Sequence, residues 1–383
     1  MYTGAWYPRT TLHLSEVFQF LHDASSDLPL KSDTMKRLQK KLELVSVTRE
    51  IDDFECIVAH TKNGVVLRYY EDGLYSLEHT SEDIVKSSQI VDEYMIKKMN
   101  VALSYLFSLG APTPKVLANI KTDHPHVISL SKKEWAHFPF LGEKYGEVYS
   151  QLESQGVTVY KTITHIFVVS DHPKSKNVQS LIEMQIFFRE FKDQLKRYLN
   201  IHRTIWEDIS QIKEQKSISS KEIVHMRNKL DGYQKTISLI TNRINQMSTY
   251  IETRSKIAQT LDIEKHLNIL FQYKFEALRD THIYIKEIWK MTSDYIDSAI
   301  QIIVEIQNQS TQKSIQSLQL ITLANVIATL LTKMALDTIP GITQKGFLYV
   351  GAIIFIAWTV NTLLISLFRH IRYQIRFPEQ SKL

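Results

Sequence analysis

Residues 314–332 read SIQSLQLITLANVIATLLT and contain no charged side chain. A second uncharged run, FLYVGAIIFIAWTVNTLLISLF, covers residues 347–368. Each run is close to the ~20 residues that an α-helix needs to cross a ~30 Å hydrocarbon layer. The pair therefore predicts a transmembrane helical hairpin, with a first span over 314–336, an outer loop over 337–346 and a second span over 347–368.

The first run carries amides and hydroxyls that an isolated membrane helix tolerates poorly. Helices with such side chains normally turn them toward other helices or toward water. The polar content therefore favours a pore built from several copies of this segment. The side chains concerned are those of Gln316, Gln319, Thr322, Asn325, Thr329 and Thr332.

Basic side chains are more frequent after the second run than between the two runs. The tail over 369–383 contains Arg369, Arg372, Arg376 and Lys382, whereas the loop between the runs has only Lys333 and Lys345. Basic residues stay on the cytoplasmic side of membrane proteins. We therefore expect a multi-pass protein of the cell (inner) membrane, with a basic cytoplasmic tail and both termini in the cytoplasm.

The chain before the first run is poor in residues that break helices. Between residues 174 and 339, Gly232 is the only glycine or proline, so this segment should be helical. Apolar residues recur there at alternating spacings of three and four, which is a heptad seam. We therefore expect a helical coiled-coil hairpin over 174–262 and a stalk helix over 263–313 that runs into the first span.

The N-terminal part has a different pattern. Short β-favouring runs are joined at Asn63-Gly64 and Asp72-Gly73, which favour tight hairpin turns because they tolerate positive φ. Residues 1–173 are therefore expected to form a cytoplasmic α/β domain. The expected fold class is an α+β cytoplasmic domain with long coiled-coil stalk helices and a two-span transmembrane helical hairpin.

Composition and motifs narrow the function. The chain is 44% hydrophobic and 23% charged with a net charge of +5, which excludes collagen-like and wholly disordered proteins. Cys56 is the only cysteine, so neither a disulfide scaffold nor a cysteine-rich zinc site is expected. Catalytic motifs are absent, so we expect no enzyme and no catalytic residue. Basic residues form no clustered patch, which argues against direct nucleic-acid binding.

The order of these segments resembles the CorA family of divalent cation channels. That family also has an α/β domain, a helical hairpin, a long helix entering a first span, a short outer loop and a second span. Residues 333–341 are similar to Gly-Met-Asn-Val-Gly-Gly-Ile-Pro-Gly of its zinc-transporting ZntB branch, and match at Met334, Ile339, Pro340 and Gly341. The resemblance implies a homo-oligomer, a pentamer, in the lipid bilayer that passes metal ions of the Mg²⁺, Co²⁺, Ni²⁺ and Zn²⁺ class.

The family signature Gly-Met-Asn is replaced here by Lys333-Met334-Ala335. In the family, the asparagine amides form a ring at the outer mouth that holds a hydrated cation. Ala335 has no oxygen to offer, and Lys333 would place a positive charge at the same ring in every subunit. The ligands of a permeant or regulatory Mg²⁺ or other divalent cation are therefore left open.

Two rows of residues on the first span compete for the pore axis. In a cyclic homo-oligomer, one row of side chains becomes a stack of rings. We favour the row that continues the heptad seam, because it matches the spacing of pore residues in the family. This row is Gln312, Gln316, Gln319, Leu323, Val326 and Leu330. The alternative is a more polar stripe formed by Thr322, Asn325, Thr329 and Thr332.

Three functions compete on this basis. The first is a CorA-like channel or transporter for metal ions, gated by its cytoplasmic domain, which would respond to a small-molecule regulatory ligand. The second is a membrane effector of type III CRISPR antiviral defence on the same scaffold, opened by a nucleotide second messenger. The third is a non-conducting, membrane-anchored coiled-coil interaction protein.

Overall fold

The computed structural model describes residues 1–6, 13–51, 54–107, 125–138, 142–214 and 217–335, and short pieces at 351, 355, 358–360, 362–363 and 372–374. The chain divides into two compact units. The first unit comprises Met1–Ile201 and Leu239–Ile288, and the second comprises His202–Ser238 and Trp289–Leu383. The division cuts through three long helices, so each of these helices contributes residues to both units.

The first unit contains a nine-stranded mixed sheet in the order β2-β3-β4-β5-β1-β6-β9-β8-β7. The β6–β9 pair is parallel, and the other pairs are antiparallel. The strands are β1 (Tyr2–Trp6), β2 (Leu44–Ile51), β3 (Glu55–Thr61), β4 (Val65–Tyr70), β5 (Leu74–His79), β6 (His126–Ser131), β7 (Ser150–Ser154), β8 (Val157–Lys161) and β9 (His165–Ser170).

Short helices surround this sheet, and three long helices follow it in the chain. The short helices are α1 (Leu14–Asp23), α2 (Ser32–Lys41), α3 (Ile84–Glu93), the π-helix η1 (Tyr94–Met99), α4 (Asn100–Phe107), α5 (Lys132–Ala136), α6 (Gly142–Tyr145) and α9 (Glu264–Phe271). The long helices are α7 (Lys176–Glu214), α8 (Ser220–Thr260) and α10 (Phe275–Ala335). Strands β10 (Ser217–Ser219) and β11 (Arg372–Gln374) pair with each other in the second unit.

Two glycines set the turns of the β3-β4-β5 meander. Gly64 and Gly73 have φ values of 76° and 87°, which residues with a Cβ rarely adopt. They follow Asn63 and Asp72, so each dipeptide supplies the positive φ that its turn requires. The resulting antiparallel register places Leu67 opposite both Ala59 and Leu77.

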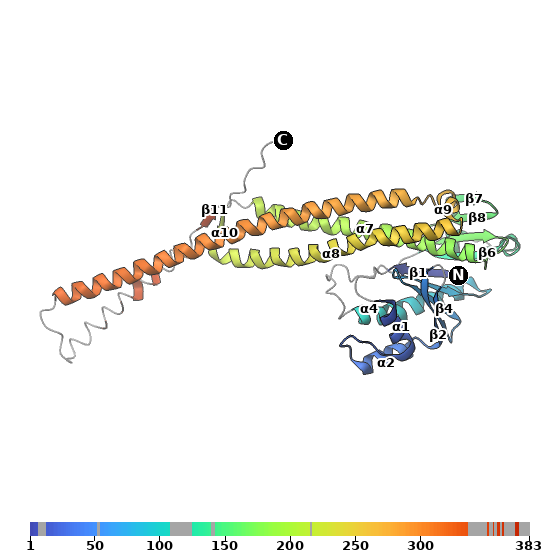
Figure 1. Cartoon of the computed structure of the whole chain (residues 1–383), viewed down its shortest axis with the longest axis horizontal. Helices are drawn as coiled ribbons and strands as arrows, with labels where there is room; N and C mark the ends of the chain where they lie inside the picture. Colours follow the sequence, from blue (N-terminus) through green and yellow to red (C-terminus); the bar gives the residue numbers. More distant parts are fainter. Residues whose placement is uncertain are drawn as a thin grey trace, which may run out of the picture. The chain divides into compact units, whose positions relative to one another are not determined.

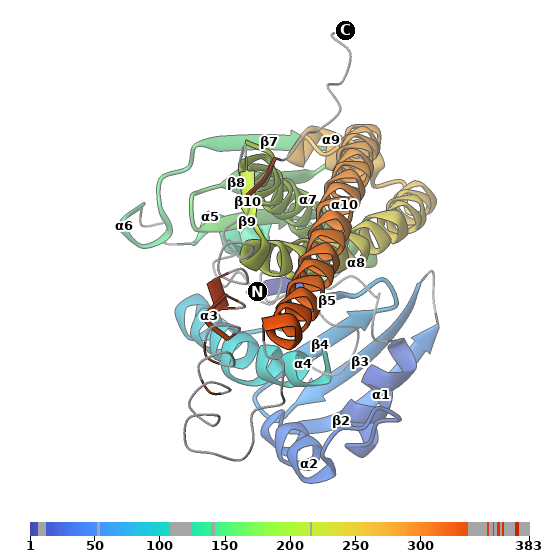
Figure 2. The ribbon, with the colours of Figure 1, turned by 90° about the vertical axis from the view of Figure 1, so that its left-hand side faces the viewer.

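Strands β1, β3, β4 and β5 are buried on both faces, whereas the edge strand β2 is mostly exposed. Successive side chains of a strand point to opposite faces. One set, including Ile57, Leu67 and Tyr75, packs in a hydrophobic core with α1, α2 and the α3-η1-α4 segment. The alternate set faces α7 and α8, where Trp6 packs on Phe187 and Phe191. Figure 1 and Figure 2 show the short helices on one side of these strands and the long helices on the other.

The other end of the sheet has a smaller aromatic core. Trp135 on α5 stacks on Tyr160 of β8 at 4.4 Å between ring centroids, and Phe167 of β9 packs beside it. Ser131 begins α5 with a capping box, because its hydroxyl accepts from the Glu134 backbone N–H while the Glu134 carboxylate accepts from Ser131 N–H. This cap fixes where the chain turns from strand β6 into the helix that carries Trp135.

In the second unit, aromatic and polar side chains join the long helices. Trp206 of α7 stacks on Tyr295 of α10 at 4.5 Å between ring centroids. On α8, Tyr233 donates a hydrogen bond to Asp208 of α7, and the Arg227 guanidinium donates to the Gln307 amide oxygen of α10 at 2.7 Å. These contacts give the three helices a defined register along one another.

The transmembrane part of the expected fold class is wrong. Within the described ranges, no helix combines the length and the apolar character needed to cross a bilayer. The segment 314–335 forms the end of α10. The expectations of two membrane spans and of a multi-pass inner-membrane location are corrected accordingly. The loop 337–346, most of 347–368 and most of 369–383 lie outside the described residues.

The central strand β1 gives a test of this packing. A Cβ added at Gly4 would lie 2.3 Å from the backbone oxygen of Tyr75, so Gly4→Ala must displace the β1–β5 pairing. We expect a loss of about 2–3 kcal/mol in the free energy of unfolding. Gly232→Ala in α8 is the matched control, because its Cβ would meet nothing within 4 Å and alanine favours helix by about 1 kcal/mol. Equal midpoints of urea unfolding for the two variants would contradict this packing.

His165 predicts a pH dependence of stability. Burial and the nearby His126 imidazole lower the pKa of His165 from 6.5 to about 4, and His126 is paired with Asp92 at 2.8 Å. Between pH 6.5 and 4 the unfolded chain therefore binds a proton that the folded chain does not, so stability falls as the pH falls. His165→Gln should flatten the acid loss of thermal stability, whereas His137→Gln at an exposed position should not. Parallel pH profiles for both variants would refute the assignment.

Candidate functional site

A cavity of about 230 Å³ lies in the first unit between the β2–β4 end of the sheet and helices α7 and α8. Its walls come from three parts of the chain that are far apart in sequence. The sheet side supplies Glu50, Phe54, Cys56, Arg68 and Tyr70; α7 supplies Lys176, Gln179, Ser180, Glu183 and Met184; α8 supplies Arg254 and Ile257, and Leu261 follows its end.

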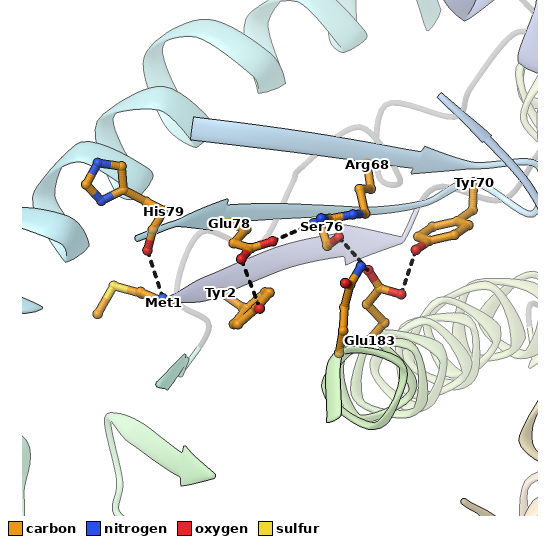
Figure 3. A network of polar contacts seen from close by, with 9 residues as sticks. Met1, Tyr2, Arg68, Tyr70, Ser76, Glu78, His79 and Glu183 are labelled. Atoms are coloured by element: carbon orange, nitrogen blue, oxygen red, sulfur yellow. Dashed lines mark hydrogen bonds and ion pairs between the residues drawn. The ribbon is translucent and has the colours of Figure 1, made fainter. Parts of the chain in front are cut away.

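A buried carboxylate, that of Glu183, forms the centre of the polar wall. It accepts hydrogen bonds from the Tyr70 hydroxyl at 2.6 Å, the Ser76 hydroxyl at 3.1 Å and the Gln179 amide at 3.2 Å. Figure 3 shows Glu183 pointing from its helix toward Tyr70 and Ser76 on the sheet. Burial, together with the Glu183 charge and hydrogen bond, raises the pKa of Tyr70 well above 10, so its hydroxyl remains a neutral donor. Glu183 thereby ties α7 to strands β4 and β5.

A buried ion pair holds α8 to the same strands. The Arg254 guanidinium donates from Nε and Nη2 to the two carboxylate oxygens of Asp72 at 2.6 Å and 2.9 Å. The two side chains are 3% and 0% exposed. The guanidinium also lies over the rings of Phe54, Tyr70 and Phe187, at 4.8–5.5 Å from their centroids. Asp72 belongs to the β4–β5 turn, so this pair joins residues 182 positions apart.

A second ion pair continues the polar wall. Arg68 Nη1 donates to Glu78 at 2.7 Å, and the Tyr2 hydroxyl donates to the other oxygen of Glu78 at 3.1 Å. Figure 3 shows this pair beside Glu183. Burial lowers the pKa of Arg68, but the Glu78 hydrogen bond and charge, with the Glu183 charge, raise it overall. Glu183 thus interacts with Arg68 and with Arg254, each of which has its own carboxylate partner.

These side chains suit binding better than catalysis. Burial and the charges of Glu50 and Glu183 raise the pKa of the Cys56 thiol to about 11, so it is protonated at neutral pH and a poor nucleophile. Among the described residues that line the cavity, none is a histidine that could act as its base. The arrangement offers fixed charges, hydrogen-bond donors and an apolar patch, which are the elements of a ligand site.

No group of three or more histidine, cysteine, aspartate or glutamate side chains in the described part of the chain is placed to hold a metal ion. The expected Mg²⁺ or other divalent cation therefore stays a prediction, without assigned ligands.

The residues predicted to line a pore lie elsewhere, near the end of α10 in the second unit. Gln312, Gln316, Gln319, Leu323 and Val326 are exposed in this chain, as are Thr322, Asn325 and Thr329 of the alternative stripe. The backbone of α10 also includes Leu330, Thr332 and Lys333-Met334-Ala335, whose side chains are outside the described set. Pro340 and Gly341 lie outside the described residues.

Sequence reasoning missed the cavity and its charges. One signal was available: Glu183 is the only charged residue in the run SLIEMQIFF over 180–188, whose other members are mostly apolar. A lone carboxylate within such a run is buried only if it is hydrogen-bonded or paired. Its partners could not be read from the sequence, because Tyr70 and Ser76 are more than 100 positions away.

Comparison with family models, with curated proteins and with solved structures finds no match to this chain. The resemblance to the CorA family therefore stays a prediction.

The buried ion pair gives the sharpest test of how the site is built. Arg254→Met would leave the Asp72 carboxylate buried and unpaired, which costs about 3–5 kcal/mol of stability. The double variant Asp72→Asn/Arg254→Met should recover part of this loss, because no buried charge remains. Lys97→Met, which removes an exposed partner of Glu93, is the control and should change stability little. If Arg254→Met unfolds at the same urea concentration as the wild type, the pair does not hold α8 on the sheet.

Proposed function

We propose that the first unit is a receptor for a small molecule, which binds in the cavity and changes how helices α7 and α8 pack on the sheet. One observation carries the proposal: the cavity is lined by the same polar groups that join these elements. Glu183 connects α7 to the sheet, and Arg254 connects α8 to the β4–β5 turn. A ligand that contacts these groups therefore changes how stably α7 and α8 pack on the sheet.

Buried polar networks respond strongly when a ligand adds or removes one of their hydrogen bonds. In a region of low dielectric constant, each hydrogen bond and charge is worth more than in water, and an unpaired group is costly. A ligand that binds one arrangement of α7 and α8 better than another shifts the population toward that arrangement. The size of the shift is limited by the difference between the two affinities. The cavity is therefore suited to sensing.

The long helices give the response a route along the chain. Helices α7 and α8 contain 39 and 41 residues, and both continue from the first unit into the second. Small shifts and rotations of packed helices are a common way to transmit a binding event. A displacement at the cavity is carried by the backbone of the helix itself.

The proposed receptor keeps one part of the channel and effector hypotheses, which also expected a small-molecule regulatory ligand. Their ion conduction needs membrane spans, and the described helices include none.

Cys56 provides a direct test, because it is the only cysteine of the chain and it lines the cavity. The intact protein is treated with a chromogenic thiol reagent at pH 8.5 in the presence of millimolar amino acids, polyamines, dicarboxylates, sugar phosphates or nucleotides. We expect at least one class to slow the modification of Cys56 several-fold and to raise the temperature of unfolding. The same compounds should leave the rate unchanged in the urea-unfolded chain. If no class changes either quantity in the folded protein, the receptor proposal is wrong.

A further inference from the structure

The size of the cavity limits the ligand. The cavity has a volume of about 230 Å³ and is partly open to solvent. A small molecule fits inside it, whereas much of a nucleotide would extend out of it. The ligand that fits wholly inside the cavity is therefore a small metabolite.

The charges around the cavity favour a ligand without a large net negative charge. The wall has three cations, Arg68, Lys176 and Arg254, and two carboxylates, Glu50 and Glu183. The ion-pair partners of the two arginines, Glu78 and Asp72, add two more carboxylates behind the wall. Carboxylates thus outnumber cations by one, so a phosphate ester or a polyanion would meet net repulsion. A ligand with an ammonium group would meet net attraction.

Groups of opposite charge lie close together on the wall, because the Glu183 charge acts on Arg68. Glu183 is 4% exposed and accepts hydrogen bonds from three neutral donors, so an ammonium group beside it would complete its hydrogen bonding as an ion pair. Arg68 makes one hydrogen bond among the described residues, from Nη1 to Glu78. A guanidinium has five N–H donors, so Arg68 retains donors for a ligand carboxylate.

A third part of the wall is apolar. Met184 of α7, Ile257 of α8 and Leu261 just after α8 line the cavity, and Phe54 lies on the sheet side. An aliphatic side chain placed against them would be removed from water, at roughly 25 cal/mol for each Å² buried. The wall therefore combines sites for an ammonium group, a carboxylate and an aliphatic side chain.

We infer that the cavity binds a free α-amino acid with an aliphatic side chain, which deepens the proposed receptor function and rests on it. The ammonium group lies by Glu183, with Glu50 nearby at the wall; the carboxylate lies by Arg68; and the side chain packs on Met184, Ile257 and Leu261. Because the site binds both the ammonium group and the carboxylate, a molecule with only one of them should bind more weakly.

Matched ligands test this inference by calorimetry on the intact chain. L-Leucine is compared with 4-methylpentanoate, which lacks the ammonium group, and with 3-methylbutylamine, which lacks the carboxylate. We expect leucine to bind and each analogue to bind at least tenfold more weakly, because each lacks one charge-assisted hydrogen-bond set. Analogue affinities equal to that of leucine, or no binding of leucine, would overturn the inference.

Variants of Glu183 and Arg68 test which of these residues binds each charged group of the ligand. Glu183→Gln removes the charge and keeps one of the two acceptor oxygens, which serve Tyr70 and Ser76 separately, so it should weaken leucine at least tenfold and leave 4-methylpentanoate unchanged. Arg68→Gln should do the reverse, weakening leucine and leaving 3-methylbutylamine unchanged. Glu207→Gln, at an exposed position of α7, is the control and should leave leucine binding unchanged. A uniform loss of all three ligands in both variants, with the midpoint of urea unfolding unchanged, would refute the assignment.

The two proposals fail in different ways. If nucleotides or sugar phosphates protect Cys56 and leucine does not, the amino-acid inference is wrong and the receptor proposal stands. If leucine and every other class leave Cys56 modification and the unfolding temperature unchanged, both proposals are wrong.

Discussion

The ion pair between Asp72 and Arg254 is the constraint on which the rest of the first unit depends. It is almost fully buried and bidentate, and it joins the β4–β5 turn to a helix that follows 182 positions later. Removing two charges from water is expensive, and their attraction offsets this only when the geometry is good. The surrounding rings exclude water, and the Leu74 backbone N–H donates a further hydrogen bond to Asp72 at 3.1 Å. The pair therefore specifies where α8 lies on the sheet more than it adds stability.

Glu183 fixes α7 on the sheet in the same way. The cavity lies between the hydrogen bonds of Glu183 and the Asp72–Arg254 ion pair. The apolar parts of the contact, such as Trp6 on Phe191 with ring centroids 5.1 Å apart, supply the burial that drives packing. Apolar packing is non-directional, whereas the hydrogen bonds of Tyr70 and Ser76 have fixed geometry. A site that exchanges hydrogen bonds with a ligand can change the register of helices without exposing their apolar faces to water. This combination suits the proposed receptor, in which ligand binding causes a small helix displacement.

The sequence predicted the features that depend on neighbouring residues and missed those that depend on residues far apart in the chain. The turns at Asn63-Gly64 and Asp72-Gly73 depend on local backbone chemistry, and the structure places turns at both positions. The long helices follow from the near absence of glycine and proline between residues 174 and 339. The spans were predicted from the lengths of two uncharged runs, but the described helices include none that is long and apolar enough to cross a bilayer, and most of the second run lies outside the described residues. The cavity was missed because its residues meet only after folding and share no periodic pattern.

Hydrogen exchange of the intact protein, with and without saturating L-leucine, tests the central claim most directly, because the claim concerns how α7 and α8 are held on the sheet. The account predicts slower exchange of backbone amides in three separate segments, the β4–β5 hairpin over 65–79, residues 176–184 of α7 and residues 250–261 of α8. Exchange that is unchanged in these segments at saturation, or that slows only elsewhere in the chain, would contradict it.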